Sequence, residues 1–417
     1  MSGDMKNREI AFSNFTLIDG NGGNPLENVT LLVNESKITA VGGRGEVEVP
    51  NNVKTLNLDG RTMIPGLIDA HLHFSGGRPA SSGMGYPGRG RMGELWRAFR
   101  AANDAKAMLY MGYTGAKDCG SNIAIGLKRA IEEGTTPGPR IMAAGGSISN
   151  TYGHVGRDPM PVEQAEALGR EHPNGVPECL RLVRTRFREG ADFIKIASGL
   201  WGESRIFPKC MPSFSYDEVK AICDEAHRAY STVASHCQGK ESIMTGLRAG
   251  VDTFEHAREF DEECAKLMLK EDKIYSPTLA VVIEGPDFAG HIDEEKKLFN
   301  SWQNESLRIA HEYGVKIASG TDFSGGDSLG GRAMGMNALD LQRLVEGGLS
   351  PMEAIVSATK VSSEAMMMED STGTLESSKL ADFVVINGDP LRDISMLQVE
   401  DRIGMVIKGG EIIVKRF

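Results

Sequence analysis

Apolar and polar positions along the chain divide it into three parts. The first 60 residues hold short runs of alternating character, such as IAFSNFTLID and NVTLLVN, separated by turn-rich stretches such as DGNGGNP. The last 40 residues repeat this texture in ADFVVINGD, IGMVIKGG and EIIVKRF. Alternation of this kind is typical of half-buried strands. We therefore expect the two ends to pair into one small β-sandwich domain of residues 1–62 plus 371–417, with two separate lobes as the alternative.

The middle of the chain, residues 63–370, alternates short apolar runs with helix-like stretches such as 216–230 and 239–250. Strands that alternate with helices predict parallel βαβ units, and eight such units are typical of a (β/α)8 TIM barrel. A doubly wound open sheet is the alternative, which a count of eight disfavours. The expected fold class is therefore α/β. The eight runs are GLIDAHLH, YTGAKDCG, RIMAAGGSIS, DFIKIAS, TVASHCQ, DTFEHA, IYSPTLAV and VKIASGTD.

Ionisable residues stand in or at the ends of several of these expected strands. Parallel strands are buried on both faces and should read as continuous apolar runs. In a barrel, the C-terminal strand ends meet at one mouth, where active sites lie. The exceptions to the apolar pattern are His71 and His73 in the first run, Lys195 in the fourth, His236 in the fifth, His256 in the sixth and Asp322 in the eighth.

Each of these residues has an ordinary interpretation when it is taken alone. An isolated His-x-His pair is more often found at the surface, and a lone strand lysine is usually an ion-pair residue. His71 and His73 are two positions apart, however, so on a strand their side chains face the same side. Gathering so many ionisable groups at one mouth is costly unless they share a ligand. Imidazole and carboxylate groups bind zinc well, so the set predicts a metal site.

Composition excludes several classes of function. The 46 Lys and Arg residues against 57 Asp and Glu residues give a formal net charge of −11, which argues against a nucleic-acid partner. No apolar run approaches the length of a transmembrane helix, and the N-terminus lacks the apolar segment of a secretory signal. The 6 cysteines are scattered, as in reduced cytosolic thiols. We expect a cytoplasmic protein without a membrane partner, and a homo-oligomer.

The stretch PGLIDAHLH at 65–73 and the segment GTLESSKLADFVVINGDP at 373–390 resemble the metal-dependent amidohydrolase superfamily, in its subtype with a carboxylated lysine. The resemblance covers nearly the whole chain and implies two divalent metal ions, with zinc expected. An ammonium has no lone pair for a cation, whereas the carbamate formed with carbon dioxide offers two oxygens. The implied ligands are His71, His73 and Asp322 for the first metal, His236 and His256 for the second, and N-carboxylated Lys195 as the bridge.

The resemblance implies hydrolysis of a carbon–nitrogen bond next to a carbonyl, with water activated by the metals. Asp322 would take the proton of this water and return it to the leaving nitrogen. His154, in NTYGHVG, would assist catalysis by a hydrogen bond to the substrate carbonyl or carboxylate; a loop histidine of no consequence is the alternative. Further substrate contacts are expected from Gln238, Trp201 and Tyr275.

Within the superfamily, the chain most resembles prolidase-like dipeptidases and carboxypeptidases, close to imidazolonepropionase. The stretches 236–239, 250–257 and 344–359 carry this resemblance. The expected substrate is a small-molecule amide, namely a dipeptide such as Xaa-Pro or an N-acyl amino acid. A cyclic amide, urea or carbamate is the alternative, and a non-catalytic barrel scaffold is the third possibility. Gln238, where relatives often carry tyrosine or histidine, departs from the pattern, and so does the segment SGLWGESRIFPKC after Lys195.

Two segments, residues 75–94 and the segment that follows Lys195, are expected to lie near the mouth of the barrel. Residues 75–94, which follow the first expected strand, are predicted to form a lid over the mouth. Within residues 75–94, GMGYPG matches the G-x-G-x-x-G pattern, but Pro87 and the surrounding glycines predict a loop and not the helix that a dinucleotide-binding turn opens. Trp201, Glu203 and Arg205 would shape the substrate pocket, with a packing loop as the alternative.

Overall fold

The structure is a computed structural model that describes residues 9–76, 91–154, 161, 163, 171–200, 210–282, 293–325 and 333–417. The predictions for residues 77–90 of the expected lid, and for Trp201, Glu203 and Arg205, lie outside these residues. Among the helices of the described part, none is long and apolar enough to cross a membrane.

The middle of the chain contains a parallel strand at each of the eight predicted runs. Within the described residues, β6, β7 and β8 form one sheet, and a second sheet has the order β15-β14-β13-β12-β9. All neighbouring strands in both sheets are parallel. The strands are β6 (Leu67–Leu72), β7 (Tyr113–Asp118), β8 (Arg140–Ala143), β9 (Ile194–Ala197), β12 (Val233–Cys237), β13 (Thr253–His256), β14 (Ile274–Ser276) and β15 (Lys316–Ile317).

Isolated bridges connect the two parallel sheets at both seams. Leu72 bridges to Phe323 and Ile148 bridges to Ile196, each in parallel. The backbone N–H of His73 also donates to the carbonyl of Phe323 at 2.8 Å. In the part of the chain that the structure describes, the ladder is not continuous across these seams. The α/β arrangement with parallel strands is therefore established, and the closed barrel stays a prediction.

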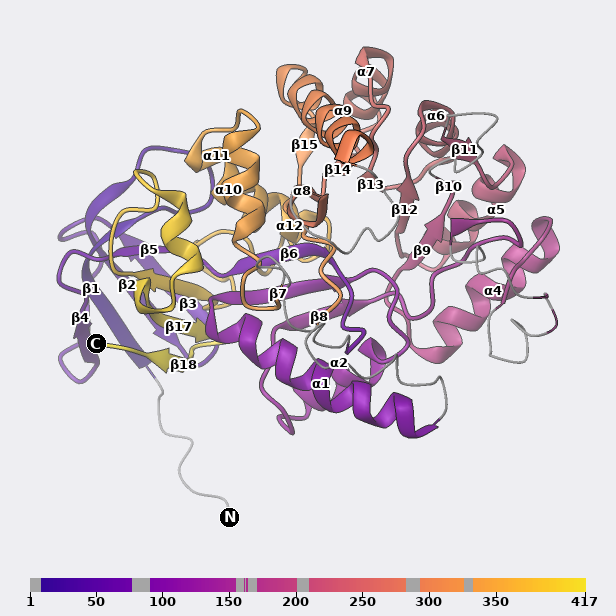
Figure 1. Ribbon diagram of the computed structural model, residues 1–417. Helices are drawn as coiled ribbons and strands as arrows, with labels where there is room; N and C mark the ends of the chain where they lie inside the picture. The colour runs from indigo at the N-terminus through magenta and orange to yellow at the C-terminus, as the bar shows by residue number, and fades with distance from the viewer. Residues whose placement is uncertain are drawn as a thin grey trace.

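Helices follow the strands and surround them (Figure 1). The predicted helices 216–230 and 239–250 correspond to α5 and α6. A capping box between Ser215 and Glu218 begins α5. The helices are α1 (Arg91–Tyr110), α2 (Ala124–Glu132), α4 (Val176–Glu189), α5 (Tyr216–Arg228), α6 (Lys240–Ala249), α7 (Glu262–Lys270), α8 (Leu279–Val282), α9 (Asp293–Glu312), α10 (Leu339–Glu346), α11 (Pro351–Val356) and α12 (Ser362–Glu364), with a π-helical turn at Ser357–Val361.

The run IYSPTLAV is a strand only in its first half. Pro277 follows β14, and proline has no N–H to donate to a ladder. Thr278 then takes a positive φ of 53°, which turns the chain away from the sheet. Leu279–Val282 form α8 instead. The prediction of an uninterrupted apolar strand at this position was therefore wrong beyond Ser276.

The two β-rich ends of the chain share one sheet at one end of the molecule (Figure 1). Its order is β18-β17-β16-β5-β1-β2-β3, with β4 beside β1, and antiparallel pairing of β5 with β16 joins the two ends. The rings of Phe12 and Phe383 meet edge to face at 5.1 Å in its core. The sandwich arrangement stays a prediction. The strands are β1 (Glu9–Leu17), β2 (Leu26–Asn34), β3 (Lys37–Gly42), β4 (Lys54–Asn57), β5 (Thr62–Pro65), β16 (Phe383–Ile386), β17 (Ile403–Lys408) and β18 (Glu411–Lys415).

The terminal sheet leads directly into the strand that carries the first two predicted ligands. Strand β5 ends at Pro65 and β6 begins at Leu67, so Gly66 alone separates them. A side chain at Gly66 would clash with that of Thr114 on β7, so only glycine permits this close approach. The terminal sheet therefore anchors the start of β6.

Candidate metal centre

The ligands predicted for the first metal lie together. His71 lies near the C-terminal end of β6, and His73 follows the strand. Their ring centroids are 5.5 Å apart. The Nε2 atoms of His71 and His73 lie 3.5 Å and 3.1 Å from Oδ1 of Asp322. Asp322 adopts φ of 57°, a left-handed conformation that aspartate tolerates better than most residues. Two histidines from the first strand of the predicted barrel and a carboxylate that follows its last strand thus lie together at one seam.

The two histidines predicted for the second metal adjoin these residues. His236 on β12 and His256 at the end of β13 have ring centroids 4.4 Å apart, and His256 lies 5.0 Å from His71. His71, His256 and Asp322 each offer one ligand atom, and these three atoms lie within 4.8 Å of one another. The structure therefore brings the four histidines and Asp322 into one cluster.

The backbone and the hydrogen bonds of His256 determine which nitrogen faces the cluster. φ is 69° at His256 and 37° at Ala257, so the strand ends abruptly here. Nδ1 of His256 lies 2.7 Å from the hydroxyl of Thr278, which donates its only proton to the carbonyl of Pro277. The hydroxyl must therefore accept from Nδ1–H. This leaves the lone pair of His256 on Nε2, where a cation can bind.

The surroundings of Lys195 indicate whether the predicted ligands suit a pair of metal ions. The side chain of Lys195 on β9 is buried, and its Nζ has no hydrogen-bond partner among the described residues. Leaving a buried amino group unpaired is costly. A carbamate at this position would replace the amino group with two oxygens that bind cations, and the charge of Lys195 acts on the imidazoles of His71 and His236 and on the carboxylate of Asp322. The donor set therefore fits a pair of divalent cations.

Burial sets the protonation of the ligands. Burial is the largest cause that lowers the pKa of His236 and of His256 well below the ordinary value of 6.5, and the charges of neighbouring histidines lower it further. Burial raises the pKa of Asp322, but the hydrogen bond with His73 and the nearby positive charges outweigh this and hold that pKa below its usual range. Neutral imidazoles beside a carboxylate are the state that metal binding requires.

His154 and Gln238 border the cluster. The ring of His154 stacks on that of His236, with centroids 4.1 Å apart and planes inclined by 20°. His154 is exposed, whereas Gln238 is buried with its side-chain nitrogen 3.1 Å from Nε2 of His236. Both positions suit contact with a substrate at the cluster, and both roles stay predictions.

Tyr275, the third described residue predicted to contact substrate, lies apart from the ligand rings. Its side chain is fully buried and stacks on Phe260 at 5.3 Å. Its hydroxyl donates to the carbonyl of His256 at 3.2 Å. The structure does not bring Tyr275 to the open side of the cluster but places it behind the backbone of His256, where it supports that ligand.

Sequence reasoning missed three charged residues at the site. Glu255 precedes His256 on β13, and its carboxylate lies 2.6 Å from Nδ1 of His71. Arg258 follows two positions later and is buried, and Asp118 at the end of β7 accepts from the backbone N–H of Phe74 at 2.6 Å. All three stand in or just after predicted strands. A search for every charged residue in or just after a predicted strand would have found these residues, although not the groups that they contact.

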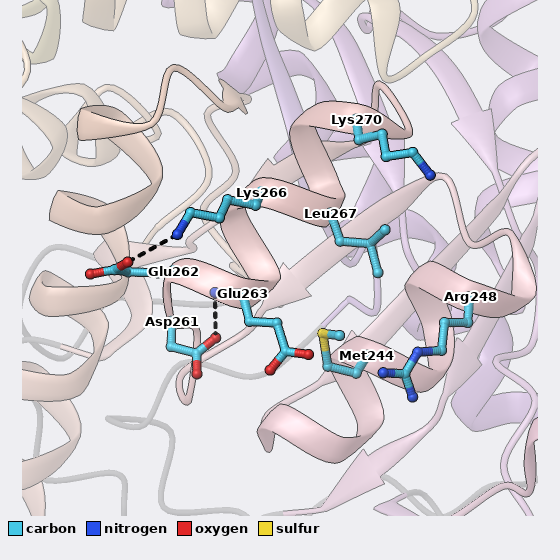
Figure 2. A pocket seen from close by; sticks show the side chains of 8 residues that line it. All are labelled: Met244, Arg248, Asp261, Glu262, Glu263, Lys266, Leu267 and Lys270. Carbon is cyan, nitrogen blue, oxygen red and sulfur yellow. Dashed lines mark hydrogen bonds and ion pairs between the residues drawn. The ribbon is translucent and has the colours of Figure 1, made fainter.

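A groove on the outer side of α6 and α7 is separate from this cluster (Figure 2). Lys266 donates to Glu262 at 3.2 Å, and Asp261 accepts from the backbone of Glu263 at 3.1 Å, so charged groups along the groove partner one another. None of the predicted ligands lines the groove, and we do not assign the chemistry to it.

A model of the amidohydrolase family matches residues 62–413. The chain belongs to this family. It is 30% identical to ochratoxinase of Aspergillus niger over 437 positions, which cover 95% of this chain and 85% of that protein. The structure resembles a Xaa-Pro dipeptidase with methionine bound in its active site (29% identity, TM-score 0.84, covering 97% of this chain and 99% of the other). It also resembles a prolidase complexed with n-methylphosphonate-l-proline (28%, TM-score 0.83, 98% and 100%).

These similarities confirm the resemblance drawn from the sequence. This amidohydrolase is a hydrolase that acts on carbon–nitrogen bonds, as the family and its enzyme relatives indicate. Proteins of the family generally bind metal ions, and His71, His256 and Asp322 form a group able to hold one.

Proposed function

We propose that this chain is a binuclear metal-dependent amidohydrolase that cleaves the amide bond of a dipeptide, Xaa-Pro or similar, or of an N-acyl amino acid. The observation that carries the proposal is the convergence of His71, His256 and Asp322, whose potential ligand atoms lie within 4.8 Å of one another, beside the buried Nζ of Lys195, which has no hydrogen-bond partner among the described residues. The structurally similar dipeptidase and prolidase were solved with methionine and a proline derivative, which supports an amino-acid product.

The proposal includes several finer features. The two parallel sheets would close into a (β/α)8 barrel of residues 63–370, and residues 1–62 plus 371–417 would form the β-sandwich. The metals would be zinc, with Lys195 carboxylated as their bridge. The protein would act in the cytoplasm as a homo-oligomer on a small-molecule amide, without nucleic-acid or membrane partners.

The residues around the cluster have distinct roles in this reaction. Bound divalent cations supply a water of lowered pKa and polarise the substrate carbonyl. Asp322, kept ionised by His73 at 3.1 Å, accepts the proton of the attacking water and returns it to the leaving nitrogen. His154, exposed and stacked on His236, donates a hydrogen bond to the substrate carbonyl. Gln238 lies against the same ring and contacts the substrate side chain.

Arg258 provides a cation for the free carboxylate of such a substrate. It is buried two residues after His256, and its positive charge acts on Asp322. Its carbonyl accepts a hydrogen bond from Ser306 at 2.7 Å, which holds the backbone in place. A guanidinium stays protonated throughout the working pH range and matches a carboxylate with two parallel donors.

Replacing Arg258 with methionine should therefore raise KM about 10–100-fold for dipeptides and N-acyl amino acids, since a charge-assisted hydrogen bond contributes about 1.5–3 kcal/mol. We expect kcat to change little. Steady-state kinetics on each substrate and on its C-terminal amide give the measurement. An equal rise in KM for the substrate and for its C-terminal amide would show that Arg258 supports the fold and does not recognise the carboxylate. Arg258→Lys, which keeps the charge, is the control and should recover part of the KM.

The experiment that tests the function is a screen of the zinc-loaded enzyme, prepared with bicarbonate, against three sets of compounds. These are dipeptides and N-acyl amino acids, their C-terminal amides, and cyclic amides, ureas and carbamates. We expect the highest kcat/KM in the first set. Faster turnover of the third set would replace our proposal with the alternative hydrolase. Absence of turnover together with less than one metal per chain would support a scaffold.

A further inference from the structure

Two buried residues of opposite charge lie on the parallel strands, next to the candidate metal centre. Glu255 on β13 and Lys117 on β7 are both fully buried. Nζ of Lys117 lies 3.0 Å from the hydroxyl of Thr253, which lies 2.8 Å from Oε1 of Glu255. The other carboxylate oxygen, Oε2, lies 2.6 Å from Nδ1 of His71. One continuous chain of hydrogen bonds therefore runs from the interior lysine to a predicted metal ligand.

The direction of each hydrogen bond follows from the chemistry of its groups. An ammonium only donates, so Lys117 donates to the oxygen of Thr253. The single proton of Thr253 then goes to Oε1 of Glu255. The buried ammonium needs an anion nearby, and the carboxylate of Glu255 supplies it. As a carboxylate, Glu255 accepts from Nδ1–H of His71.

These bonds leave His71 in one tautomer and one orientation. The ring proton is on Nδ1, so the lone pair is on Nε2, and Nε2 is the atom that faces Asp322 at 3.5 Å. A carboxylate on the far nitrogen also makes an imidazole a more basic ligand, and losing such a partner typically weakens metal binding about 10–100-fold. In the part of the chain that the structure describes, Nε2 of His236 contacts Gln238 and Nδ1 of His256 contacts Thr278, and neither ring has a carboxylate in the place that Glu255 takes at His71.

We propose that Glu255, whose charge Lys117 compensates through Thr253, is the positioning residue that orients His71 for metal binding. The inference rests on the proposed metal centre and deepens it. It assigns a role to two charged residues that otherwise lie in the interior without a function. It also predicts that the two metal positions differ in their dependence on Glu255, because His71 belongs to the first and His256 to the second.

The test is cobalt titration of the metal-free protein, followed by visible absorbance and by the metal content per chain. Wild type should bind two ions. Glu255→Gln keeps the size of the side chain but removes its charge, and we expect one of the two ions to bind about 10–100-fold more weakly while the other is unchanged. Glu225→Gln is the matched control, because Glu225 is also a buried carboxylate in an ion pair, with Arg184 at 2.7 Å on the outside of the molecule.

A double variant separates positioning from stability. Glu255→Gln alone leaves the Lys117 ammonium buried without its anion, and this destabilises the fold. Glu255→Gln with Lys117→Met removes both charges, so we expect thermal stability to recover while cobalt affinity stays weakened. Recovery of both thermal stability and cobalt affinity would overturn the positioning role of Glu255 and leave it a purely structural role. Unchanged affinity in the single variant would also overturn it, whereas a wild type that binds no cobalt would refute the proposed metal centre as well.

Discussion

Replacing Asp322 with asparagine should lower kcat about 10²–10⁴-fold, the usual contribution of a positioned general acid or base. Asparagine has almost the same shape and keeps an oxygen for the contact with His73, which lies 3.1 Å from the present carboxylate. It has no negative charge and cannot take a proton from the attacking water. The measurement is kcat at saturating dipeptide with the zinc-loaded protein.

Three controls are needed to interpret this result. Circular dichroism and the melting temperature should match those of wild type, because one oxygen is exchanged for nitrogen at the rim of the strands. Metal content must be measured in parallel, since Asp322 is also a predicted ligand. Asp261→Asn is the matched variant, because Asp261 caps α7 away from the cluster and asparagine caps a helix equally well. An unchanged kcat in Asp322→Asn would remove this residue from proton transfer.

The sequence predicted the parallel strands and the convergence of the residues expected to be ligands because both follow from local patterns. A buried strand reads as a short apolar run, and a histidine or aspartate at its end is a visible exception. His71 and Asp322 are 251 positions apart, yet their atoms lie 3.5 Å from each other because parallel strands bring their C-terminal ends to one side. The parallel topology therefore brings polar residues from separate strand ends together in one candidate site.

The partners of these ligands could not be predicted in the same way. Glu255 interrupts an apolar run, but nothing near it in sequence shows that its carboxylate meets His71 from β6. Tyr275 was expected to contact the substrate, whereas its hydroxyl donates to the carbonyl of His256. Hydrogen bonds between strands depend on which residues become neighbours when the strands pair, and the hydrophobic pattern within one strand does not encode that pairing. The turn to α8 depends on the positive φ of Thr278, which periodicity does not reveal, although Pro277 in the run is a visible signal against a longer strand.

Replacing Lys195 with alanine should remove most of the bound zinc and abolish turnover. In the structure its Nζ is buried without a hydrogen-bond partner among the described residues, and its charge acts on His71, His236 and Asp322. If Lys195 carries a carbamate, the alanine variant loses two oxygen ligands at once. The measurement is zinc per chain after dialysis against metal-free buffer, together with kcat. Lys128→Ala is the control, because Lys128 pairs with Asp192 outside the cluster. We expect this variant to retain the full zinc content.

Rescue by small acids distinguishes a carbamate from an ordinary lysine. Alanine leaves a space along the former side chain, and formate, acetate or propionate can bring a carboxylate to the position of the lost carbamate oxygens. Partial return of zinc and turnover, increasing with acid concentration, is the expected result, and ethylamine, which restores only an amine, should have no effect. Wild type reconstituted in buffer stripped of carbon dioxide should take up zinc slowly until bicarbonate is added. Full zinc in the alanine variant without any added acid would show that Lys195 bridges nothing, and the cluster would then be limited to the histidines and Asp322.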